Sequence, residues 1–170
     1  MNFNSNFKVL PDMTNVPVSQ PDTPGAVSGV ALVLQNVYLK DCSFEAPQGP
    51  RVNGEWNPQI ALDLNTSVQP LAGDVREVVL TVTVSAKQAE TTLFLVEVKQ
   101  AGAFAMQNMS PEEFKRAVSS VCPTVLFPYA RAAVSQLVSQ GGFPQLLLPP
   151  VNFDALYAGS QSEAANATKN

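Results

Sequence analysis

The chain has 170 residues and a net charge of −4, contains no histidine, and only 14% of its residues are charged. This length fits one domain with a substantial core. An acidic chain lacks the basic face that nucleic-acid phosphates require, so we expect no nucleic-acid partner. The usual general base and most zinc or iron sites need histidine, and we therefore expect neither an enzyme nor a metal site. The low charge predicts that apolar surface is covered by other copies of the chain or by an apolar ligand.

Residues 1–28 are rich in Asn, Pro, Ser and Thr and show no apolar periodicity. This composition predicts a flexible N-terminal arm. No basic region followed by an apolar stretch opens the chain, and no segment approaches the roughly 20 apolar residues of a membrane span. We therefore expect a cytoplasmic protein without direct membrane insertion. Cys42 and Cys122 lie far apart, and we expect two free thiols, with a disulfide as the open alternative.

Four segments carry strand patterns, at residues 30–46, 59–68, 76–86 and 91–106. Short polar turns join the last two and no helical pattern intervenes, which predicts an antiparallel meander. The fourth segment has apolar residues on both faces. We therefore expect a second layer over part of its other face, formed either by the chain's own helices or by another subunit.

Helical patterns follow the strands. The Ser-Pro-Glu-Glu sequence from Ser110 is typical of a capping box, and the short helix that it begins is predicted to end at Pro123. A second helix is predicted at 129–140, with a broad apolar stripe, few charges and a stop at Gly141-Gly142. A third begins near Asn152, which can act as N-cap. The fold class predicted is α+β, a four-stranded antiparallel sheet with C-terminal helices packed on one face.

Three blocks of sequence carry more specific information. They read YLKDCSFEAP at Tyr38–Pro47, FLVEVKQAG at Phe94–Gly102, and CPTVLFPYAR at Cys122–Arg131 continuing as GGFPQLLLPPVNFDALY at Gly141–Tyr157. None is a cofactor fingerprint, and their order and spacing resemble the SecB family of bacterial protein-export chaperones. The resemblance implies a SecB-like chaperone domain at 29–158. The residues that follow are small and polar, which predicts a flexible tail at 159–170. Ala132 and Gln140 depart from the family pattern, where we expect Glu and Arg.

The resemblance also implies a function. Members of the family bind unfolded preproteins in the cytoplasm without ATP, keep them competent for translocation and deliver them to the SecA motor. They use no cofactor and assemble as a homotetramer, a dimer of dimers. Two alternatives stay open: a SecB-like chaperone of a toxin–antitoxin system, and a structural oligomerisation domain whose apolar surface only makes the assembly.

Four residues are candidates for docking SecA. Asp41 and Glu45 lie four apart on one strand, so both side chains project from one face. The resemblance adds Leu95 and Glu97 and implies a flat acidic patch that attracts basic SecA segments. The alternative is that these are ordinary solvated charges.

Two further sets come from the resemblance. Tyr38, Phe44, Trp56, Phe153, Leu156 and Tyr157 are expected to form a client groove, with a place in the core as the alternative. Phe94, Val96, Val98, Gln100, Ala133 and Leu137 are expected at the oligomer interface, with ordinary packing within the chain as the alternative.

Overall fold

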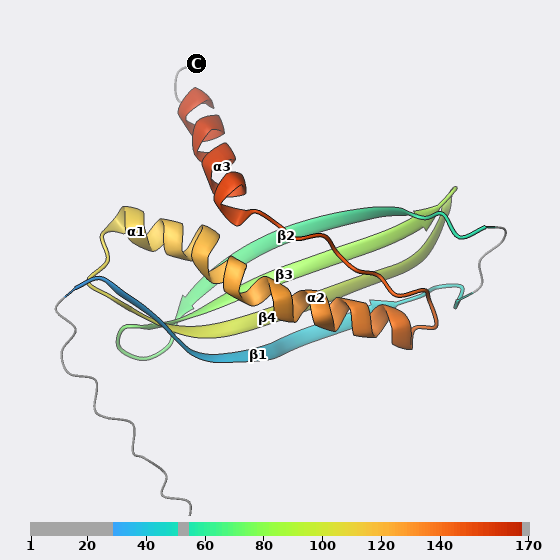
Figure 1. The fold of residues 1–170 in the computed structure, drawn as a ribbon, viewed down its shortest axis with the longest axis horizontal. Coiled ribbons are helices and arrows are strands. Elements are labelled where there is room, and N and C mark those ends of the chain that lie inside the picture. The colour runs from blue at the N-terminus through green and yellow to red at the C-terminus, as the bar shows by residue number, and fades with distance from the viewer. Residues whose placement is uncertain (1–28, 51–54, 168–170) are drawn as a thin grey trace, which may run out of the picture.

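The computed structural model describes residues 29–50 and 55–167, so the arm predicted at 1–28 lies outside the described residues. Four strands, β1 (Ala31–Glu45), β2 (Gln59–Pro70), β3 (Val75–Gln88) and β4 (Thr91–Gln107), form a single sheet. Their order is β1-β4-β3-β2, and every neighbouring pair is antiparallel (Figure 1). The four predicted strands are confirmed close to their predicted ends, because two-residue alternation is a local signal.

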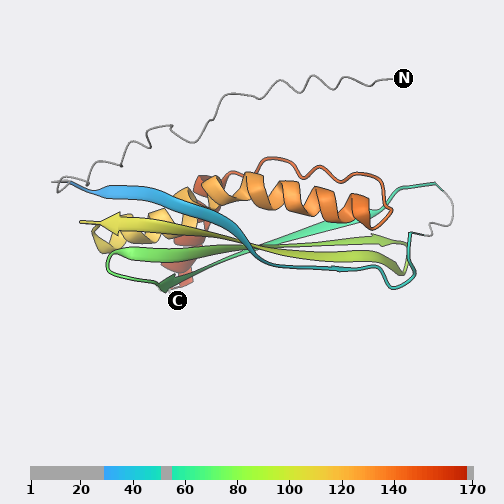
Figure 2. The ribbon, with the colours of Figure 1, turned by 90° about the horizontal axis from the view of Figure 1, so that it is seen from below.

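The sheet has one face covered by helix and one without. Paired residues in antiparallel strands point to the same side of a sheet. Val82 pairs with Val98 and Val84 pairs with Val96, and all four side chains are fully buried. They face helix α2 (Cys122–Gln140), which together with the segment at 141–152 lies over this side of the sheet (Figure 2). We call this side the helix-covered face and the opposite side the helix-free face.

The first predicted helix does not end at Pro123. Helix α1 (Pro111–Arg116) runs through one π-helical turn (Ala117–Val121) into α2, so residues 111–140 form one helical segment. Ser110 caps it with the predicted capping box. The wider π turn ends at Val121, two residues before Pro123, which has no amide hydrogen to donate to the helical hydrogen bonds. Proline is therefore accommodated there, and the predicted break at this position is wrong.

Apolar packing explains the position of this long helix. Leu126, Ala130, Val134 and Val138 follow one another at four-residue spacing and are fully buried against the sheet. Residues 111–140 are long and apolar enough to cross a membrane by length and composition, but 44% of the most apolar window is buried inside the structure. The buried residues of this segment include the stripe from Leu126 to Val138, as in a helix that covers a sheet with one side only.

The ends of the helices are fixed by local chemistry. Gly141 is the C-cap of α2, and Gly142 has a φ of +82°, which confirms the Gly-Gly stop. Asn152 caps helix α3 (Phe153–Ala167) through its Oδ1, which accepts the Ala155 amide at 3.0 Å. Figure 1 shows α3 projecting away from the sheet. This helix continues to Ala167, so residues 159–167 of the predicted polar tail are helical.

Candidate functional site

The four predicted docking residues share the helix-free face. A β-bulge separates Leu39 from Asp41, and beyond it β1 places Asp41 opposite Lys99 and Glu45 opposite Leu95. Glu97 lies between Lys99 and Leu95 on the same side of β4. The structure therefore brings these residues into one acidic patch, which we define as Asp41, Glu45, Leu95 and Glu97.

Lys99 belongs to this surface and was not singled out from the sequence. Its Nζ lies 3.0 Å from Asp41 Oδ2 and 3.3 Å from Glu97 Oε1. Its hydrogen bond to Asp41, then that to Glu97 and the charges of both carboxylates raise the pKa of Lys99. Lys99 thus holds two carboxylates of the patch together and offsets part of their charge. The sequence showed that Lys99 shares a face of its strand with Leu95 and Glu97. Its pairing with Asp41 depends on the register between β1 and β4, which the sequence did not show.

Tyr38 does not lie with the other predicted groove residues. It pairs with Ala101 on the helix-free face, whereas Phe44 pairs with Val96 on the helix-covered face. The phenol of Tyr38 donates a hydrogen bond to Glu77, and this bond, burial and the carboxylate charge raise the pKa of Tyr38 to about 12. A side chain on the opposite face cannot line the groove with Phe44, so its assignment to that groove is corrected.

Glu77 is the centre of a polar cluster on the helix-free face. Glu77 is 4% exposed, and its carboxylate accepts hydrogen bonds from Tyr38, Lys40 and Gln69. We call these four residues the Glu77 cluster. Burial alone would raise the pKa of Glu77, but the three hydrogen bonds and the Lys40 charge outweigh it and lower the pKa. The carboxylate is therefore ionised at neutral pH.

Phe44 and Trp56 meet in an aromatic cluster at the end of α2. Phe143, which follows the Gly-Gly stop, lies 6.2 Å from Phe44, 6.0 Å from Trp56 and 5.1 Å from Phe94 between ring centroids. The loop residue Trp56 is thus anchored by ring contacts. Sequence reasoning missed Phe143, the ring that joins the others, although its place directly after Gly142 was visible.

The remaining groove residues lie at the start of α3. Phe153 is buried and packs edge-on against Phe127 at 5.8 Å, so it is a core residue. Leu156 is 54% exposed, and Tyr157 is half-buried and donates a hydrogen bond to Glu112 at 2.8 Å. All three line a small cavity of about 170 Å³, together with Leu64 and other residues of β2 and the helices. Apart from Tyr38, the predicted groove set is therefore split between two places on the helix-covered side.

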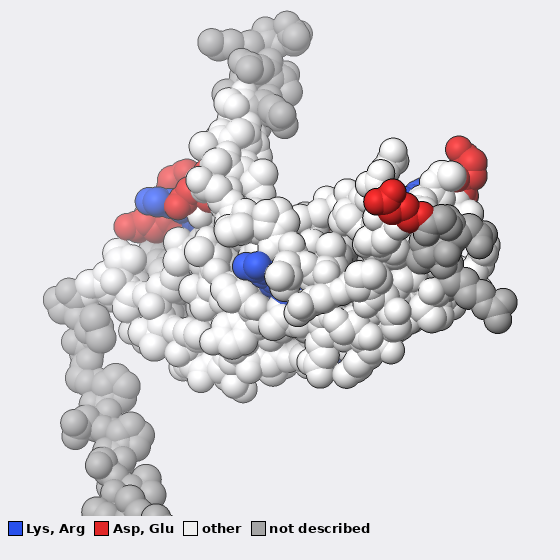
Figure 3. Space-filling model, turned by 45° about the vertical axis from the view of Figure 1, so that its right-hand side comes forward, with Lys and Arg blue, Asp and Glu red and all other residues white. Residues whose placement is uncertain are grey.

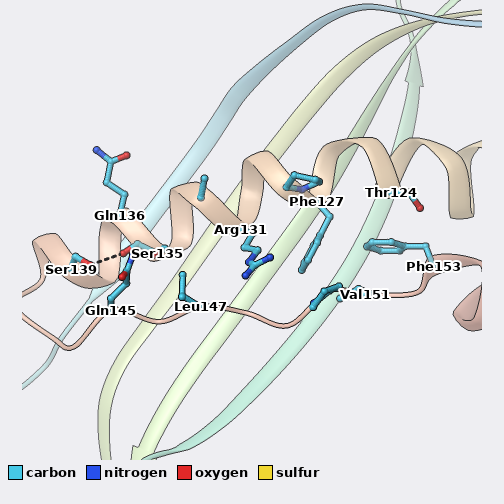
Figure 4. A pocket seen from close by; sticks show the side chains of 13 residues that line it. Thr124, Phe127, Arg131, Ser135, Gln136, Ser139, Gln145, Leu147, Val151 and Phe153 are labelled. Atoms are coloured by element: carbon cyan, nitrogen blue, oxygen red, sulfur yellow. Dashed lines mark hydrogen bonds between the residues drawn. The ribbon is translucent and has the colours of Figure 1, made fainter.

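A larger cavity of about 680 Å³ lies between α2 and the segment that crosses back over the sheet. Its walls are mostly apolar, with Phe127, Leu147 and Val151 among the lining residues (Figure 4). Arg131 is the one charged residue that lines it, and Figure 4 shows its side chain extending from α2 towards the crossing segment. This cavity can hold extended apolar chain.

The sheet is wider than the helix that covers it. Leu34 and Leu39 of β1 are 38% and 49% exposed, and Ile60 and Leu62 of β2 are 40% and 36% exposed. All four point to the helix-covered face, so apolar side chains remain open on both flanks of α2. Figure 3 shows a broad uncharged surface on this side, with charged side chains gathered mainly towards the two ends. Exposed apolar area of this kind marks an interaction surface.

Four of the predicted interface residues lie in the chain's own core. Phe94, Val96, Val98 and Gln100 are at most 4% exposed and face the layer formed by α2. These side chains pack within the chain, so they would lie under a contact made by the outer surface of α2 and not in it. Their place at the oligomer interface stays a prediction. Ala133 and Leu137 are half-buried on α2 and remain accessible at its surface.

The chemistry of these surfaces is that of binding. In the described part of the chain, no three His, Cys, Asp or Glu side chains are grouped so that they could hold a metal ion. Cys42 is exposed, and burial raises the pKa of the Cys122 thiol to about 12. The acidic patch can attract a basic partner, and the apolar flanks of α2 can bury apolar chain.

Comparisons with known proteins identify the family to which the chain belongs. Residues 26–164 match the family described as SecB, preprotein translocase subunit SecB. The chain is 54% identical over 127 residues to the protein-export protein SecB of Pseudomonas paraeruginosa, covering 74% of this chain and 78% of that one. It is 44% identical over 153 residues to the protein of the same name from Stutzerimonas stutzeri, covering 87% and 93%.

A solved structure has the same fold. The SecB-like chaperone of Mycobacterium tuberculosis, in complex with a peptide from an antitoxin, superposes with a TM-score of 0.60 at 17% identity, covering 71% of this chain and 91% of that chain. The family match spans both the sheet and the helices, and the sequence identity extends over most of the chain. The chain belongs to the SecB family.

Proposed function

We propose that this chain is an ATP-independent chaperone that binds unfolded preproteins in the cytoplasm, keeps them competent for translocation and delivers them to the SecA motor. The observation that carries the proposal is the open apolar surface on both flanks of α2. Extended polypeptide can bury side chains there and add backbone hydrogen bonds at the edge of β2, and such binding tolerates many sequences. The relatives named protein-export protein SecB support the assignment to export.

The acidic patch is proposed as the docking surface for SecA. Asp41, Glu45 and Glu97 gather carboxylates around Leu95 on a face that is separate from the apolar flanks of α2. A motor and a client could therefore be held at the same time. The attraction is electrostatic, so it should speed encounter with a basic segment and weaken as salt rises.

A homotetramer, as a dimer of dimers, is proposed for the assembly. The outer surface of α2 carries few charges, and β1 is an edge strand whose outer backbone groups are open to pairing. Ala133 and Leu137 are the candidate contacts that remain accessible. The same surfaces support a structural oligomerisation domain, which would assemble without binding clients.

An aggregation assay separates these functions. The full chain should suppress aggregation of a denatured protein equally with and without ATP, while a purely structural domain should not suppress it. Leu62→Ser with Leu156→Ser should weaken suppression, because both side chains are exposed on the helix-covered side. Val33→Ser is the matched control, since Val33 is 54% exposed but points to the helix-free face. Equal loss in both variants would contradict the proposed client surface.

A toxin–antitoxin chaperone is the second candidate. The solved structure holds a peptide from an antitoxin, but at 17% identity it shows the fold alone. Binding of the full chain to the isolated C-terminal segment of SecA, measured at low and moderate salt, distinguishes the two. No binding at low salt would remove SecA docking at this patch.

A further inference from the structure

The acidic patch depends on one extra residue in β1. Leu39 pairs with Gln100 and Asp41 pairs with Lys99, although Gln100 and Lys99 are consecutive in β4. Lys40 therefore has no partner residue in β4 and is the extra residue of a β-bulge. Its side chain is nevertheless held, because its Nζ forms an ion pair with Glu77.

This bulge decides which way the carboxylates of β1 point. Side chains alternate between the faces of a regular strand, and Tyr38 is on the helix-free face. Regular alternation from Tyr38 would turn Asp41 and Glu45 to the helix-covered face. The extra residue shifts the alternation by one, so both carboxylates lie on the same side as Glu97.

The ion pair at the bulge is anchored in the middle of the sheet. Lys40 reaches Glu77 on β3 across the intervening strand β4, which carries the small side chains of Ala101 and Ala103 opposite this region. Gln69 of the far edge strand β2 binds the same carboxylate. Glu77 is thus fixed from both sides, and it offers Lys40 a site of defined position and charge.

We propose that Lys40 and Glu77 are positioning residues for the acidic patch: their ion pair keeps the extra residue of β1 at the bulge and thereby holds Asp41 and Glu45 beside Glu97. They act through the strand and do not contact the basic partner. The inference rests on the proposed docking of SecA, and it assigns a role to two residues outside the patch.

Removal of the Lys40 charge separates two effects on binding of the SecA segment, because the change in charge should tighten binding and the loss of positioning should weaken it. Lys40→Met makes the protein one unit more negative, so charge alone should tighten binding of a basic segment. Loss of positioning should instead weaken binding of the isolated C-terminal SecA segment, by about threefold or more at low salt. Lys87→Met removes an exposed lysine from β3 and measures the effect of charge alone. Lys40→Arg can still pair with Glu77 and should bind like the wild type.

Hydrogen exchange of the full-length variants tests the position of the strand without any partner. In Lys40→Met, the amides of residues 41–45 should exchange about tenfold faster, while those at the centre of β3 keep their protection. Lys40→Arg should restore the slow exchange. Unchanged exchange at 41–45 in Lys40→Met would overturn the inference, and so would binding at least as tight as that of Lys87→Met.

The experiments distinguish failure of the proposed SecA docking from failure of the positioning role of Lys40 and Glu77. If the wild type does not bind the SecA segment, the docking proposal is lost, and hydrogen exchange alone decides whether Lys40 and Glu77 hold the strand. If the wild type binds and Lys40→Met behaves like Lys87→Met, docking stands and the positioning role is removed.

Discussion

Gly141 lies directly against the ring of Phe44: a Cβ added to Gly141 would come within 2.3 Å of the Phe44 Cζ atom. The contact joins the end of α2 to β1 and to the aromatic cluster. Gly141→Ala should therefore destabilise the fold by about 1–3 kcal/mol, the usual cost of overpacking. Chemical denaturation measures the loss. Gly159→Ala is the control, because its added Cβ meets nothing within 4 Å outside the local backbone of α3, and it should cause no loss. Equal stability of Gly141→Ala and wild type would contradict this contact.

The burial of Val98 changes what a substitution there should do. Val98 is fully buried beneath α2, so Val98→Glu places an unpaired charge in the core and should prevent stable folding. Ala133 is only half-buried at the margin of α2, where a longer side chain can reach solvent. Ala133→Glu should therefore leave the fold intact while it shifts the assembly to smaller species. Circular dichroism reports folding and native mass spectrometry reports size. A Val98→Glu variant that folds and only dissociates into smaller assemblies would contradict the burial of Val98 beneath α2.

Removal of Lys99 should strengthen docking. Its ammonium group is paired with Asp41 and Glu97, so Lys99→Met exposes more negative potential on the acidic patch. Binding of the C-terminal SecA segment should become about two- to fivefold tighter at low salt, and the gain should shrink at 0.5 M salt. Lys115→Met on α1 is the control, because it removes the same charge away from the sheet. Weaker binding by Lys99→Met would mean that Lys99 orders the patch more than it neutralises it.

Tyr38 should titrate later than an ordinary tyrosine. Its pKa is raised from 10.0 to about 12, chiefly by its hydrogen bond to Glu77. A raised pKa of this kind contributes stability that is fully present below pH 10 and is lost as the pH rises towards 12. Ultraviolet absorbance should show a phenolate that forms near pH 12. This late step should disappear in Tyr38→Phe, move to lower pH in Glu77→Gln and persist in Tyr129→Phe. The pKa of Tyr157 is also raised, chiefly by its hydrogen bond to Glu112, so Tyr157→Phe shows whether a late step that survives Tyr38→Phe belongs to Tyr157.

The sheet could be predicted from the sequence because alternation and turn residues act over a few positions. The capping box at Ser110, the stop at Gly141 and the cap at Asn152 were predictable for the same reason. Pro123 misled the prediction, since a π turn widens the helix just before it and the proline is then accommodated. Such a turn is not visible in a pattern of apolar spacing.

The site was less predictable because it depends on the register between strands and on which element covers each face of the sheet. Tyr38 and Phe44 are both aromatic residues of one strand, and only the bulge and the pairing show that they face opposite sides. Phe94 and Val98 were apolar on a strand with two apolar faces, and composition could not tell a helix of the same chain from another subunit. Glu77 was not singled out, because two of its partners, Tyr38 and Lys40, lie 39 and 37 residues away in sequence.

The extra residue at Lys40 has a consequence for insertions and deletions. Deleting Lys40 removes the bulge and its ion pair together, and regular alternation then keeps Tyr38, Asp41 and Glu45 on their present face. A strand shortened by one residue at this point should therefore preserve the acidic surface. Deleting Ser43 instead would turn Phe44 away from Phe94, with which it now stacks at 5.8 Å. Strand β1 is thus expected to tolerate the loss of a residue at this bulge and to lose its packing when a residue is deleted three positions further on.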